Sequence, residues 1–149
     1  MAFLIRNTRE KIVVKILRMS DRINVKIGEL SFELAPLSND RKIEISSCTK
    51  KQDGIDVYDH GSSQHLYIKY SLKNVTGLTD YNDKEYKLSF ENEVLTDDCV
   101  SEIFMIPQKQ ELMAAAWQLL NGMPEKLIDH NGKEIKGVKL EVITGLNQK

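Results

Sequence analysis

The chain has 149 residues, 41% of them hydrophobic and 29% charged, and its formal net charge at pH 7 is -1. This size and composition are typical of one globular domain, and the near-neutral charge gives no bulk attraction to nucleic acid or to an anionic membrane. No apolar run approaches the roughly 18 residues that span a bilayer, and the start MAFLIRNTREK is too short in apolar residues for a signal peptide. We therefore predict a single domain over residues 1–149, with loose ends at 1–10 and 145–149, and expect no membrane partner.

The N-terminal part of the chain predicts strands. The run KIVVKILR (11–18) is rich in β-branched residues and is predicted to be a strand. In RINVKIGELSFELAPL, apolar and polar residues alternate on both sides of Gly28-Glu29, a pair that fits a two-residue type II′ turn. We therefore predict an antiparallel hairpin over residues 22–34 with one buried face, made of Ile23, Val25, Ile27, Leu30, Phe32 and Leu34.

The central part mixes helix and loop signals. Ser38 is a suitable N-cap after the strand-ending Pro36, so a helix is predicted over 38–50, with Asp40 in its first turn. Residues 50–63 are predicted to be an exposed, turn-rich loop. The segment QHLYIKYSLKNV (64–75) fits both strand alternation and helical spacing. We favour a helix, capped by Ser62 or Ser63 and ending before Gly77.

The C-terminal half predicts two helices and a last strand. A loop is predicted over 79–85, a short strand over 86–90, and a helix that begins at Thr96. Pro107 separates it from a second helix in PQKQELMAAAWQLLNGMP (107–124), and a turn at 131–132 precedes the alternating strand VKLEVI (138–143). No internal repeat is apparent. The predicted fold is α+β: a small antiparallel sheet, formed by the N-terminal hairpin strands and a C-terminal strand, packed against about four helices.

The residues that commonly form catalytic, metal-binding or phosphate-binding sites do not have the spacing that such sites require. The stretch DHGSSQH contains Asp, His and Ser but no nucleophile elbow, and no glycine-rich phosphate loop occurs. Acidic residues within 80–98 do not match a calcium loop, and the basic residues between 6 and 22 favour a solvated sheet edge over a nucleic-acid patch. We therefore expect no catalytic residue, no cofactor, no metal, no nucleic acid and no enzymatic activity, with the usual candidates in structural roles: His60, His65, His130, Cys48 and Cys99.

The helix that holds the single tryptophan has an unusually broad apolar face. Leu112, Ala116 and Leu119 share one line of the helical wheel and suffice to bury it against a sheet. The remaining apolar residues are predicted to bind a partner helix, which leaves Trp117 only partly buried; they are Met113, Trp117 and Leu120 on a neighbouring line, and Met123 at the end of the first line. The alternative is that the whole face is intramolecular core.

The order of these elements resembles that of the small tail assembly chaperones, or closely related minor tail proteins, of tailed bacteriophages. The resemblance spans residues 30–122 and rests on LAPLS, on YSLKNVTGLTDYNDKEYKLSFENEVLTDDCVSEIF and on KQELMAAAWQLLNG. Its motifs are Gly77-Leu78-x-Asp80, Tyr86-x-Leu88-x-Phe90-x-Asn92 and Leu95-Thr96. The chain departs from the pattern at Lys84-Glu85, where a glycine is usual, and in its extra C-terminal strand.

The resemblance implies a non-enzymatic role in the host cytoplasm. Such chaperones resemble holdases that keep the apolar stripes of the long helical tape measure protein from aggregating before the tail tube polymerises around it. The implied partner is therefore a tape measure or tail tube protein, with a homo-oligomer left open. The alternative is a virion structural component, such as a tail, neck or decoration subunit, that self-assembles or docks through exposed strands.

Overall fold

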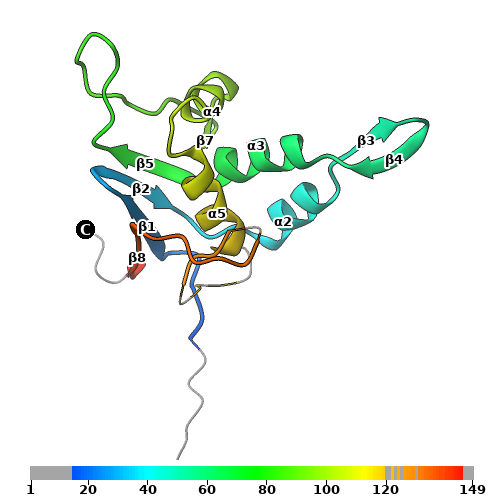
Figure 1. Ribbon diagram of the computed structural model, residues 1–149, viewed down its shortest axis with the longest axis horizontal. Helices are drawn as coiled ribbons and strands as arrows, with labels where there is room; N and C mark the ends of the chain where they lie inside the picture. Colours follow the sequence, from blue (N-terminus) through cyan, green and yellow to red (C-terminus); the bar gives the residue numbers. More distant parts are fainter. Residues whose placement is uncertain (1–14, 120–121, 123, 125, 130, 146–149) are drawn as a thin grey trace, which may run out of the picture.

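The computed structural model describes residues 15–119, 122, 124, 126–129 and 131–145, and it shows the predicted α+β fold (Figure 1). The described helices are α2 (Asn39–Ser46), α3 (His60–Ser71), α4 (Asp97–Ile103) and α5 (Lys109–Leu119). The main sheet has four antiparallel strands in the order β5-β2-β1-β8, namely β5 (Leu72–Thr76), β2 (Leu30–Leu34), β1 (Arg22–Ile27) and β8 (Val138–Ile143). Two small hairpins complete the described strands: β3 (Thr49–Gln52) with β4 (Ile55–Tyr58), and β6 (Phe90–Glu91) with β7 (Val94–Leu95).

The predicted N-terminal hairpin is confirmed. Val25 pairs with Phe32 in an antiparallel register, and Gly28 has the positive φ of 60° that the first position of a type II′ turn requires. All six residues of the predicted face are buried, and α5 packs against β1 from that side. The alternation of apolar and polar residues therefore predicted both the pairing of the two strands and the face of the hairpin that is buried.

The outer strands of the sheet come from distant parts of the chain. β8 pairs with β1 over its whole length, which confirms the predicted C-terminal strand. β5 pairs with β2, with a register shift between Glu33 and Leu34. The segment 64–75, which fits both helical spacing and strand alternation, is part helix and part strand: α3 ends at Ser71 and β5 begins at Leu72. The cap of α3 is Asp59, whose side chain accepts from the Ser62 N–H, and not Ser62 or Ser63 as predicted.

The segment after α2 corrects two predictions. α2 is capped by Ser38 as predicted but ends at Ser46, and the predicted loop over 50–63 instead contains the β3–β4 hairpin. Asp53 and Gly54 both have positive φ, which is the geometry of a type I′ hairpin turn. This hairpin projects from the body of the molecule (Figure 1), and its strands bury no side chain fully. Without a buried face there is no apolar alternation to detect.

Two other strand predictions are wrong in part. The predicted strand over 86–90 is irregular except at Phe90, which begins β6. Of the predicted strand over 11–18, residues 15–18 are not in a strand, and residues 11–14 lie outside the described residues. The predicted loose ends also fall largely outside the described residues.

A repeated loop, which the sequence analysis missed, is visible in the structure. The segments LTDYNDKEYK (78–87) and LIDHNGKEIK (127–136) share their Leu, Asp, Asn, Lys, Glu and last Lys. In the first, the Asp80 N–H donates to the Lys84 carbonyl at 2.9 Å; in the second, the Asp129 N–H donates to the Lys133 carbonyl at 2.8 Å. Each aspartate also accepts two backbone N–H groups through its side chain. The chain thus uses one hairpin turn twice.

The two copies differ at the residue that must adopt a left-handed conformation. Asp83 has φ 61° in the first copy, and Gly132 has φ 81° at the equivalent place in the second. Because glycine adopts this conformation without a steric penalty, Asp83→Gly should raise the free energy of unfolding by about 0.5 kcal/mol. The reverse change, Gly132→Asp, should lower it by a similar amount. Urea unfolding of both variants checks this, and a shift of both in the same direction would contradict it.

Candidate partner-binding surface

α5 is buried on one side and open on the other. Its fully buried residues are Leu112, Ala115 and Ala116, which contact the shared core with α3 and β1. The small alanines permit close approach of neighbouring backbone. On the other side Trp117 is 47% exposed, as the prediction of partial burial requires. The indole is a large amphipathic side chain of the kind that serves as an anchor in protein contacts, so this side of α5 is a candidate contact surface.

Trp117 leans against a tyrosine of α3. The ring centroids of Tyr67 and Trp117 are 6.1 Å apart with the planes tilted by 50°. Tyr67 is only 2% exposed, and its hydroxyl is buried with no hydrogen-bond partner among the described residues. Burial raises the pKa of this phenol, so it stays neutral at all ordinary pH values. The exposed indole therefore rests on a rigid aromatic support.

The space beside this aromatic pair is a seam between α5, α3 and the sheet. It is lined by Tyr67 and Ser71 of α3, by Ala116 and Leu119 of α5, and by the end of β2 and the residues after it. Its volume is only about 20 Å³, enough for about one water molecule. A small-molecule ligand does not fit in this space.

The structure places two of the four predicted contact residues. Met113 and Trp117 are four residues apart on α5 and so share one side of the helix. Met113 is partly buried against the core, while Trp117 is the exposed member. Leu120 and Met123 lie outside the described residues. The α5 surface is defined below as Met113 and Trp117.

A returning segment covers a further side of α5, which the sequence analysis did not predict. The Gln118 side chain binds the Ile128 backbone twice: its amide group donates to the Ile128 carbonyl, and its oxygen accepts the Ile128 N–H at 3.3 Å. Leu127 beside it is buried. Leu127 and Ile128 are the first two residues of the second copy of the repeated loop.

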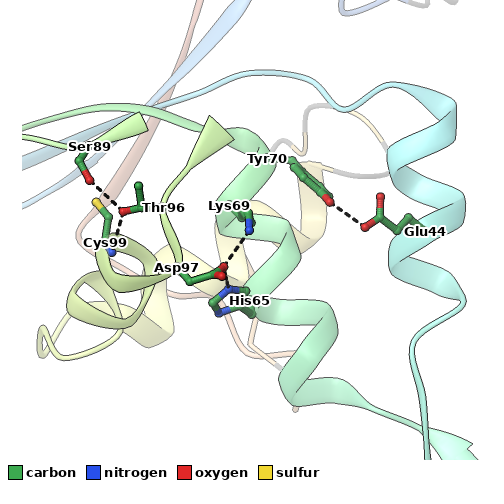
Figure 2. Close-up of polar contacts among 8 residues, drawn as sticks. All are labelled: Glu44, His65, Lys69, Tyr70, Ser89, Thr96, Asp97 and Cys99. Atoms are coloured by element: carbon green, nitrogen blue, oxygen red, sulfur yellow. Dashed lines mark hydrogen bonds and ion pairs between the residues drawn. The ribbon is translucent and has the colours of Figure 1, made fainter. Parts of the chain in front are cut away.

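Polar contacts hold α4 on α3 (Figure 2). The Asp97 carboxylate lies 2.8 Å from the Lys69 ammonium and 2.9 Å from the His65 ring. Thr96 caps α4 as predicted, with its hydroxyl accepting the Cys99 N–H. The contacts explain how a helix of seven residues is fixed in place. In the described part of the chain, no three His, Cys, Asp or Glu residues are grouped to hold a metal ion.

Asp97 makes stability depend on acid pH. The hydrogen bonds from Lys69 and His65 lower its pKa to about 2 from the ordinary 3.8. Since the folded-state pKa is the lower one, the stabilisation is complete above pH 3.8 and is lost as the pH falls through about 2. Asp97→Asn should therefore be slightly less stable than the parent chain at neutral pH, and this difference should vanish in acid. Thermal melts across the acid range measure it, with Asp98→Asn as the control for loss of a charge from the same turn. A difference that does not change with pH would contradict the assignment.

The cysteines occupy structural positions of two kinds. Cys99 is buried on α4, as expected, and its sulfur lies 3.2 Å from the Tyr86 hydroxyl, which also donates to Glu102. Cys48 lies between α2 and β3, not on a helix face as expected, and is partly exposed. Burial and then the Asp59 charge raise the pKa of its thiol, which disfavours the reactive thiolate.

Comparison with known proteins adds no relative. No protein-family model, no curated protein and no solved structure matches this chain. Within the described residues, no helix combines the length and apolarity that crossing a bilayer requires.

Proposed function

We propose that the protein is a non-enzymatic tail assembly chaperone-like protein that binds an amphipathic helical partner through the α5 surface. The observation that carries this proposal is Trp117, 47% exposed on a helix whose opposite side is buried. A large aromatic side chain on a rigid element suits a partner helix because its area is buried on binding with little loss of side-chain entropy. Met113 beside it supplies adaptable packing against varied partner sequences.

Two further features support the proposal. The resemblance to tail assembly chaperones covers the region that contains α5, and it implies a tape measure or tail tube protein as the partner in the host cytoplasm. The seam lined by Tyr67 and Ala116 has a volume of only about 20 Å³, which is too small to capture a small molecule.

The test is co-expression with a long, helix-rich tape measure protein. We expect that protein to stay soluble and to co-purify with the chain, and to aggregate when it is expressed alone. Trp117→Ala should strongly reduce both effects. Phe90→Ala is the matched control, because Phe90 has a similar exposed fraction (44%) and lies on β6. Equal solubility with and without the chain would contradict the proposal.

A virion structural role is the second candidate. The projecting β3–β4 hairpin favours it, because an arm that buries no side chain fully within its own chain is suited to contact with a neighbouring subunit (Figure 1). Mass spectrometry of purified virions separates the two functions. A chaperone is absent from the particle, whereas a structural component is present in a fixed copy number.

A further inference from the structure

A second cavity, separate from the α5 surface, gathers three cations from three elements. Its volume is about 270 Å³, and it is lined by Arg22 of β1, Arg41 of α2 and Lys73 of β5. Among the residues that line it in the described chain, the one carboxylate is that of Glu93. Glu44 does not line the cavity but pairs with Arg41 at 3.3 Å, so two carboxylates stand against the three cations and one positive charge remains in excess. Such a convergence is notable in a chain of net charge -1.

The two guanidinium groups are held in place by their neighbours. Arg22 donates through one Nη1 atom to the carbonyls of Met19 at 3.1 Å and Asp21 at 2.8 Å. Arg41 lies 4.0 Å from the Tyr70 ring centre and 3.3 Å from a Glu44 oxygen, while Glu44 also accepts the Tyr70 hydroxyl (Figure 2). Each guanidinium is thus oriented in advance and retains further N–H donors.

Lys73 is the third cation of the cavity. It is partly buried, and its ammonium donates to the backbone carbonyl of Glu93 at 3.3 Å, a contact that brings no neutralising charge. Burial and the positive charges of Arg22 and Arg41 lower the pKa of Lys73, and the Glu93 carboxylate offsets only part of this. An anion placed among the three cations would relieve their mutual repulsion.

The surroundings select the kind of anion. α2 begins at this cavity, but the Ser38 side chain already accepts the Arg41 N–H at its N-terminus. Asp40 in the first turn adds a negative charge there. Free backbone N–H groups at a helix start, which often complete a phosphate site, are therefore few here. Apolar side chains in the wall, from Met19, Leu37 and Val94, suit the aliphatic part of a peptide. We propose that this cavity binds the carboxylate side chains of an acidic segment of a partner protein.

The experiment is a titration of the ¹⁵N-labelled full chain with hexaglutamate, followed by NMR. We expect saturable shifts at the amides of Lys73, Glu93 and Ser38, and no shifts with hexaglutamine. Lys73→Met, which keeps the aliphatic stem, should weaken binding about tenfold. Lys26→Met removes the same charge from an exposed position of β1 outside the cavity and should leave binding unchanged.

Glu93→Gln provides a gain of function that misfolding cannot imitate. By removing the one carboxylate of the wall it should tighten hexaglutamate binding about threefold or more. Trp117→Ala should leave this binding unchanged, so the cavity and the α5 surface are tested separately. Equal weakening by Lys26→Met and Lys73→Met, no tightening by Glu93→Gln, or binding of inorganic phosphate in preference to the peptide would each overturn the proposal.

Discussion

Gly77→Ala should lower the free energy of unfolding by roughly 3 kcal/mol. Gly77 follows β5 with φ 88°, a conformation that side chains other than glycine rarely adopt. A Cβ atom there would lie 2.3 Å from the Glu29 carbonyl oxygen in the turn between β1 and β2. Since that oxygen belongs to the backbone, the clash is relieved only by moving the hairpin away from β5.

Gly28→Ala separates the two parts of this effect. Gly28 also has a positive φ, of 60°, but no atom lies within 4 Å of the position its Cβ would take. Its replacement should therefore cost only the conformational strain, about 1 kcal/mol. Chemical denaturation of both variants gives the comparison. Equal losses of stability in Gly77→Ala and Gly28→Ala would show that the predicted clash with the Glu29 carbonyl does not contribute to the free energy of unfolding.

Trp117→Ala should weaken binding of the helical partner by about 2 kcal/mol or more, roughly thirtyfold in Kd. The reason is that the exposed part of the indole becomes buried only in the complex. The same change should cost less than this in the stability of the isolated chain, because 47% of the side chain is already in water. Calorimetric titration and denaturant unfolding of one variant measure both quantities.

The opposite pattern would place the binding surface elsewhere. If Trp117→Ala cost about 3–5 kcal/mol in stability, as loss of a buried aromatic does, the face would be core. Phe90→Ala serves as the control for removal of an aromatic side chain of similar exposure. It should leave partner binding unchanged.

The parts of the fold that bury one face could be predicted from the sequence. The β1–β2 hairpin, β8 and the caps of α2 and α4 each carry a local signal, either alternation or a polar cap. The β3–β4 hairpin carries no such signal because it buries no face, and its turn at Asp53-Gly54 was the one available indication. Residues 64–75 were predicted as one helix, although they contain the end of α3 and most of β5. The reason is that helical and strand spacing meet without a break at Ser71 and Leu72.

The candidate surfaces divide in the same way. The partial exposure of Trp117 was predictable, because helical periodicity places more apolar residues on this helix than one packing side needs. The cationic cavity was not, since Arg22, Arg41 and Lys73 are far apart in sequence and meet only in the folded chain. The contact of Gln118 with Ile128 was equally invisible to local patterns.

The most direct test of the account is the fluorescence of Trp117 during titration with the partner helix. The chain has one tryptophan, so the emission reports on this side chain alone when the partner segment lacks tryptophan. The account predicts emission typical of a partly hydrated indole in the free chain and a saturable shift to the blue on binding. Binding that leaves the emission of Trp117 unchanged would contradict the assignment of the α5 surface.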